Sequence, residues 1–110
     1  MQVSKEKAKK ISLEGVTIFE YLNLENSPGI GFCREEVSKK YGPVINHQSK
    51  MIYCITDGNP LFVVANKKYQ LKPNDLIVIE KGTKYYSEGS YKGFTISIPA
   101  FDVSKVEFLK

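Results

Sequence analysis

Short apolar stretches separated by turn residues occupy most of the chain. Stretches rich in Val, Ile, Phe and Tyr alternate with Gly, Pro, Asn or Asp, a pattern typical of β-strands joined by turns. The predicted strands are residues 16–22, 29–37, 51–55, 61–65, 68–71, 76–79, 85–87, 94–98 and 103–108. Asn66-Lys67 is predicted to form a tight hairpin turn, and Tyr41-Gly42-Pro43 a second turn. The pattern predicts one all-β domain over residues 1–110, a sandwich or barrel with little or no helix.

The N-terminal segment differs from the rest of the chain. Residues 1–14 lack strong strand character and are predicted to be an extension or an edge strand, with a helical turn at residues 5–11. Their lysines are not followed by an unbroken apolar stretch and a small-residue cleavage site, so we do not expect a secretory signal. No apolar run approaches the roughly 20 residues that a membrane span needs. We therefore expect a cytoplasmic protein with no membrane partner.

Charge and cysteine content exclude several classes of function. The 16 basic and 12 acidic residues give a net charge of +4, but the basic residues are scattered, which argues against a nucleic-acid partner. Cys33 and Cys54 form no CxxC motif, so neither a zinc knuckle nor a redox pair is indicated. We interpret both as reduced, apolar-like side chains.

Residues 47–89 contain an ordered series of features. A strand at 51–58 ends in a glycine, a hairpin follows at 61–71, and Pro73-Asn74-Asp75 leads into an apolar strand that ends at residue 79. Gly82-Thr83 then precedes Tyr85. This series resembles the cupin family, whose fold is a double-stranded β-helix, a small jelly-roll barrel. The resemblance predicts the fold far better than the chemistry, because one fold of this kind hosts many functions.

The resemblance also implies four positions for metal ligands. In metal-binding family members these are three histidines and one glutamate, which suit divalent transition metals. The corresponding positions here are Ile45, His47, Met51 and Tyr85. Only His47 is a strong donor, so we expect no tightly bound metal. The alternative is a divalent transition metal held weakly at His47, with oxygen donors from Asn46, Gln48 or Glu35.

Strand alternation indicates what the barrel interior contains. If His47 and Met51 point inward, Tyr53 shares their face, and Tyr85 faces inward while Tyr86 points away. This composition fits either an apolar-aromatic ligand pocket or a core filled by the same side chains. The neighbouring positions 52 and 54 are also apolar, which favours a strand covered on both sides, by the opposite sheet or by a partner subunit.

Arg34 and Glu35 are adjacent on one predicted strand, so one of them must face inward. An inward Arg34 favours a carboxylate or phosphate ligand. An inward Glu35 favours a sugar hydroxyl, an amine or a residual metal. The sequence leaves both alternatives open.

Three functional hypotheses follow. The first is a cupin that binds a small molecule, a carbohydrate or small carboxylate, without a complete metal site, and that forms a homodimer. The alternative is an enzyme, a sugar isomerase, epimerase or dioxygenase-like cupin using His47 and Tyr85, with or without a weakly held metal. The third is a structural role in which residues 103–109 dock on a partner's sheet. Enzymatic activity stays open, with a metal-dependent enzyme disfavoured.

Overall fold

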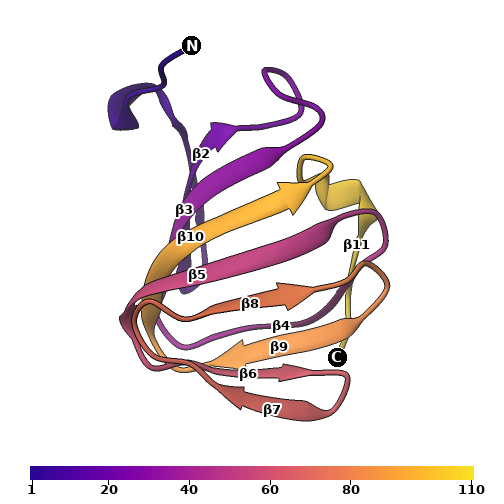
Figure 1. The fold of residues 1–110 in the computed structure, drawn as a ribbon. Helices are drawn as coiled ribbons and strands as arrows, with labels where there is room; N and C mark the ends of the chain where they lie inside the picture. Colours follow the sequence, from indigo (N-terminus) through magenta and orange to yellow (C-terminus); the bar gives the residue numbers. More distant parts are fainter.

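The computed structural model describes residues 1–110 and consists almost entirely of β-strands (Figure 1). The strands are β1 (Lys9–Leu13), β2 (Val16–Leu22), β3 (Gly31–Val37), β4 (Lys40–Asn46), β5 (Lys50–Gly58), β6 (Leu61–Val64), β7 (Lys67–Gln70), β8 (Leu76–Ile79), β9 (Lys84–Glu88), β10 (Tyr91–Ile98) and β11 (Val106–Phe108). Two short 3₁₀ turns, η1 (Lys5–Lys7) and η2 (Val103–Lys105), are the only helical segments. None of the helical segments has the length and apolar character needed to cross a membrane.

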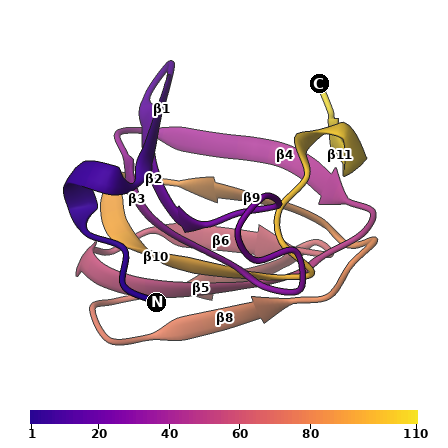
Figure 2. The same cartoon turned by 90° about the horizontal axis from the view of Figure 1, so that it is seen from above.

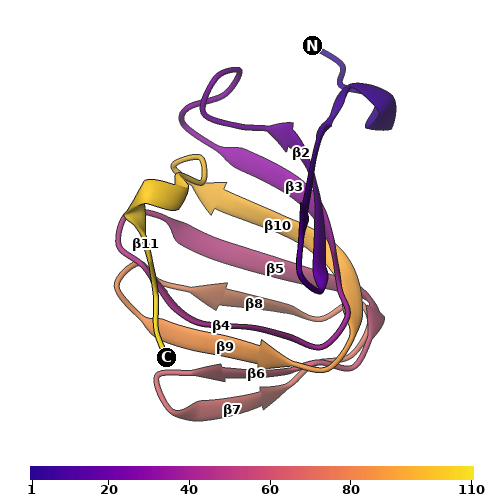
Figure 3. The same cartoon turned by 180° about the vertical axis from the view of Figure 1, so that it is seen from behind.

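Two antiparallel sheets form the barrel. The six-stranded sheet has the order β1-β2-β3-β10-β5-β8, and the five-stranded sheet the order β11-β4-β9-β6-β7. Figures 1 and 3 show the strands of each sheet side by side. Seen from above, β4 lies along one side of the barrel and β5 and β10 along the other, with β1 to the left and β11 to the right of the view (Figure 2). The predicted all-β architecture with little helix is confirmed.

The sequence pattern missed β4 and left β1 open as either an extension or an edge strand, and each outcome has a physical reason. β1 is an edge strand on which no residue is fully buried, so it shows no clear apolar alternation. β4 contains Gly42-Pro43, which the sequence pattern marks as a turn, but here the strand continues through a register shift between Tyr41 and Val44. Proline is tolerated at such an irregularity because it need not donate to the ladder. Gly42 has a φ of +91°, which favours glycine there.

Two predicted segments are corrected. Val64 pairs with Lys67, so the hairpin turn is Ala65-Asn66, both with positive φ, and not Asn66-Lys67. Such a pair of positive φ values is typical of the type I′ turn that joins tight hairpins. The predicted strand at 103–108 is η2 followed by the short β11, because Asp102 accepts a hydrogen bond from the backbone N–H of Ser104 and starts a turn.

The packed part of the core lies between the sheets around Phe62. The Phe62 ring lies 5.1 Å from that of Tyr53 and 5.8 Å from that of Tyr91, measured between centroids, and Ile55 and Val44 are equally buried. On β5, burial alternates as expected, with odd-numbered residues 51–55 inward.

The outer face of the six-stranded sheet is also apolar. Leu76 and Val78 of β8 are exposed there. That a partner subunit covers this outer face stays a prediction.

Candidate functional site

An internal cavity of about 240 Å³ lies beside the packed core. A single water needs only about 10–15 Å³, so the cavity is large enough for several atoms of a ligand, although it is somewhat smaller than the roughly 300–1,000 Å³ of most ligand sites. Of the 17 lining residues, 13 are hydrophobic. They are Ile11, Leu13, Val16, Ile18, Glu20, Leu22, Phe32, Cys33, Glu35, Tyr41, Met51, Tyr53, Thr95, Ser97, Phe101, Val103 and Phe108. The interior is thus neither wholly filled nor wholly open.

Glu35 is the most buried charged residue of this cavity. It sits on β3, paired with Ile18 of β2 and Gly93 of β10, and only 7% of it is exposed. The Tyr91 hydroxyl donates a hydrogen bond to its Oε1 atom over 2.7 Å. No Lys, Arg or His lines the cavity, so burial raises the pKa of this carboxyl, and only the hydroxyls of Tyr91 and Thr95 oppose that effect. Between the two alternatives left open by the sequence, Glu35 faces inward and Arg34 points away.

Other polar groups lie in one row across the same sheet. Glu20 pairs with Cys33, Cys33 with Thr95, and Thr95 with Tyr53. The Thr95 hydroxyl is buried and forms no hydrogen bond within ordinary distance and angle limits, although it lies near enough to Glu35 and Cys33 to lower the pKa of both. Burial raises the pKa of Glu20 and, together with the nearby Glu35, that of the Cys33 thiol. The row therefore offers the cavity a free hydroxyl, a carboxyl and a protonated thiol, but no nucleophilic thiolate.

A pair of tyrosines closes the inner side of the cavity. The hydroxyl oxygens of Tyr53 and Tyr85 lie 2.6 Å apart, and their rings meet edge to face. Because one hydroxyl donates to the other, the pair keeps one proton that it can donate elsewhere. Burial raises the pKa of both phenols, so both stay protonated near neutral pH. Tyr53 lines the cavity directly, whereas Tyr85 lies behind it.

His47 does not lie in the cavity, which corrects its assumed inward direction. The inward residues of β4 are Val44 and Asn46, so alternation turns Ile45 and His47 away from the interior. The side chain of His47 is 53% exposed, and its Nε2 atom lies 2.8 Å from Oε1 of Glu107. His47 and Tyr85 therefore do not face one shared substrate. Met51, Tyr53 and Tyr85, by contrast, do point inward.

The residues at the implied metal positions do not fit a metal. The chain has no group of three or more His, Cys, Asp or Glu side chains that could hold an ion. The Oδ1 atom of Asn46 accepts hydrogen bonds from the backbone N–H groups of Gln48 and Ser49, and its Nδ2 atom contacts the sulfur of Met51. Asn46 is thus engaged in holding the loop after β4, and we derive no chemistry through a metal.

Several cavity residues were missed by the sequence reasoning. They are Glu20, Cys33, Tyr41 and Thr95, and Tyr91, which does not line the cavity but donates to Glu35, was missed as well. A signal existed for the first of them, because Glu20 shares the parity of Val16 and Ile18 on a predicted strand, which turns a carboxyl toward the core.

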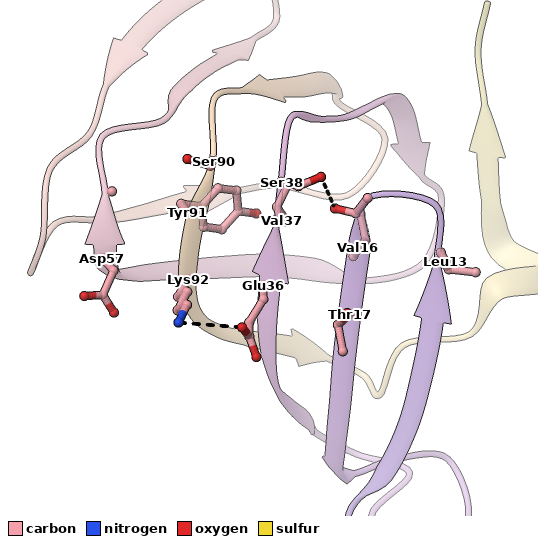
Figure 4. A pocket seen from close by; sticks show the side chains of 12 residues that line it. Leu13, Val16, Thr17, Glu36, Val37, Ser38, Asp57, Ser90, Tyr91 and Lys92 are labelled. Atoms are coloured by element: carbon pink, nitrogen blue, oxygen red, sulfur yellow. Dashed lines mark hydrogen bonds and ion pairs between the residues drawn. The ribbon is translucent and has the colours of Figure 1, made fainter.

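A second depression lies on the outside, beside the β1–β2 hairpin (Figure 4). It has a volume of about 430 Å³ and is shallow and open to solvent. Lys92 Nζ and Glu36 Oε1 lie 3.7 Å apart there, and the Ser38 hydroxyl donates to the carbonyl of Gly15. Because these groups are exposed and already paired with one another, the internal cavity is the better candidate site.

The comparisons with known proteins concern the fold. No family model matches the sequence, and neither does any curated protein. Among solved structures, Pac13 from Streptomyces, described as a nucleoside dehydratase, superposes with a TM-score of 0.88 at 18% identity, covering 100% of this chain and 91% of Pac13. Related structures contain Pac13 variants with uridine.

Two further structures are similar. KdgF from Halomonas sp. has a TM-score of 0.76 at 14% identity, covering 93% of this chain and 96% of that one. Ectoine synthase from P. lautus has a TM-score of 0.80 at 11% identity, covering 100% and 90%. At such identities the likeness shows the fold alone. The chain has a cupin-type jelly-roll fold, as the sequence resemblance predicted.

Proposed function

We propose that the chain binds a small uncharged molecule inside the barrel, held by hydrogen bonds to Glu35 and Thr95. The observation that carries the proposal is a buried carboxyl with one protein hydrogen bond, facing a cavity of about 240 Å³ that no basic residue lines. A buried polar group normally has its hydrogen bonds satisfied, so the free capacity of Glu35 and Thr95 favours a polar ligand.

The charges of the cavity argue for an uncharged ligand. Glu35 and Glu20 are the only carboxyl side chains that line the cavity. No basic side chain lines it, so an anionic ligand would find no positive charge there. A phosphate or carboxylate would lose its hydration without gaining a cation, which costs several kcal/mol. The small carboxylate considered from the sequence is therefore disfavoured, and a hydroxyl-bearing molecule is favoured. Uridine, present in the Pac13 structures, is an uncharged molecule of this kind.

A thermal-shift experiment with matched pairs tests the proposal. Uridine is compared with uridine 5′-phosphate, and glucose with glucose 6-phosphate, each at millimolar concentration. We expect at least one uncharged member to raise Tm, since a ligand present at 100 times its Kd adds about 2.7 kcal/mol of stability. The phosphorylated partner should give no shift. A larger shift with the phosphorylated member, or no shift with any member, would contradict the proposal.

A second candidate is acid–base catalysis in the same cavity. Glu35, with its raised pKa, and the hydrogen-bonded pair of Tyr53 and Tyr85 approach one interior space. A carboxyl with a raised pKa is a candidate acid–base group, and the protonated phenols can donate a hydrogen bond to a substrate. In this version of the enzyme hypothesis, Glu35 takes the acid–base role that the sequence analysis gave to His47. Once a substrate is identified, Glu35→Gln should lower kcat by about 10²–10⁴-fold, in addition to any loss of binding. A kcat within about threefold of wild type rejects the catalytic role.

A further inference from the structure

Three exposed apolar side chains surround the entrance to the internal cavity. Leu13 on β1, Val103 on η2 and Phe108 on β11 are 56%, 64% and 58% exposed, and all three line the cavity. They come from both ends of the chain, and β1 and β11 belong to different sheets. Exposed apolar side chains that gather at the rim of a cavity, and do not lie scattered, are typical of a binding site.

The cavity therefore changes in character from its entrance to its inner end. The rim is apolar and in contact with water, while the inner end carries Glu35 and the unpartnered hydroxyl of Thr95, both almost fully buried. Tyr41 joins the two regions, because its ring meets that of Phe108 edge to face at 6.4 Å. A ligand that only formed hydrogen bonds at the inner end would leave the apolar rim exposed to water. A ligand that only covered the rim would form no hydrogen bond with Thr95.

We infer that the ligand is amphipathic, with an uncharged hydroxyl-bearing head that reaches Glu35 and Thr95 and an apolar or aromatic part that lies against Leu13, Val103 and Phe108. This inference rests on the proposed function and narrows its ligand class. The apolar part replaces water at the rim, and the head completes the hydrogen bonds inside.

The test uses 2-phenylethanol as a minimal probe, with ethanol as the head alone and 3-phenylpropionate as the anionic analogue. Methyl NMR spectra of the full chain are recorded during each titration. We expect saturable shifts at Thr95, Leu13 and Val103 with 2-phenylethanol, and at least about tenfold weaker binding of ethanol, because the ring buries several additional carbons. The anion should also bind more weakly than the alcohol.

Matched variants separate the rim from apolar surface elsewhere. Leu13→Ser is compared with Leu76→Ser on the outer face of β8, where Leu76 is equally exposed at 57%. Leu13→Ser should weaken 2-phenylethanol about fourfold, the ratio for about 0.8 kcal/mol of one buried CH₂, while Leu76→Ser leaves it unchanged. Preserved dispersion of the methyl spectra shows that each variant is folded.

The outcomes distinguish the inference from the proposed function. Equal binding of ethanol and 2-phenylethanol, or equal effects of the two leucine variants, overturns the amphipathic ligand, while a Tm shift by uridine or glucose would keep the proposed function. If 2-phenylethanol fails to shift Thr95 although uridine or glucose raises Tm, only the inference fails. If no probe shifts Thr95 and none raises Tm, both fail.

Discussion

The two ends of the barrel interior are built from the same sheets but differ in how their side chains are satisfied. Around Phe62, aromatic rings and aliphatic side chains fill the space, and Phe62 itself is only 1% exposed. Around Glu35, a cavity remains, and Thr95 has no partner. Packing of the first kind contributes stability through burial and dispersion, whereas unsatisfied buried polar groups reduce it. The region around Phe62 is therefore expected to contribute more to stability, whereas the neighbouring region around Glu35 is the proposed binding site.

The largest expected effect lies at the packed end. Phe62→Ala should lower the free energy of unfolding by about 3–5 kcal/mol, because it leaves a cavity among rings that cannot collapse into it. Urea denaturation measures the loss. The control is Phe108→Ala at the exposed rim, which should cost less than about 1 kcal/mol. Similar losses for the two variants would contradict the division of the core into two ends.

The open end should respond to pH through Glu35. Burial raises the pKa of Glu35 above its ordinary value of 4.5, so above that pH the unfolded chain loses this proton first. The folded protein then holds more protons, and this contribution to stability falls as pH rises from 4.5 through the folded-state pKa. Glu35→Gln removes this pH-dependent contribution to stability, while the amide oxygen of Gln can still accept the hydrogen bond from the Tyr91 hydroxyl. We therefore expect Glu35→Gln to gain stability relative to wild type as pH increases, in unfolding measured from pH 4 to 8. If Glu35→Gln instead lost stability relative to wild type as pH increases, the result would contradict a buried Glu35 carboxyl with a raised pKa.

A smaller effect concerns thiol chemistry at the open end. In a Cys54→Ser variant, Cys33 is the only thiol, and its raised pKa and burial should slow its reaction with a disulfide reagent at least about tenfold relative to glutathione. Unfolding the variant in urea should remove the difference, which serves as the control. A rate as fast as that of glutathione in the folded protein would mean that the cavity is far more accessible than the structure indicates.

The smallest effect is expected outside the barrel, at His47. Its hydrogen bond with Glu107 joins the loop after β4 to β11, but both side chains are about half exposed. Exposed pairs of this kind contribute about 0–1 kcal/mol. His47→Gln should therefore change stability by less than about 1 kcal/mol and leave ligand binding unchanged. A clear loss of binding in His47→Gln would return this residue to the functional site.

Much of the fold could be predicted because strand alternation and turn residues are local signals. β2 and β8 begin and end where the apolar pattern does, and Met51, Tyr53 and Tyr85 face inward as their parity requires. β4 could not be predicted, because Gly42-Pro43 imitates a turn within a strand. The inward direction assumed for His47 came from the ligand position that the resemblance implied, and the alternation on β4 turns it outward.

The candidate site was harder to predict than the fold. The choice between Arg34 and Glu35 depends on which face of β3 meets β2 and β10 inside the barrel, and that is a property of the assembled sheet. The contribution of β1, η2 and β11 to the rim depends likewise on segments far apart in the chain. Local patterns contain neither kind of information.

The most direct test of the central claim is the affinity of the uncharged ligand that stabilises the protein most, measured by calorimetry on wild type, Glu35→Gln and His47→Gln. The account predicts that Glu35→Gln loses about tenfold in affinity, the effect of about 1.4 kcal/mol from one altered buried hydrogen bond, while His47→Gln binds as wild type does. The opposite result, a loss for His47→Gln with Glu35→Gln unaffected, would contradict an interior site built on Glu35.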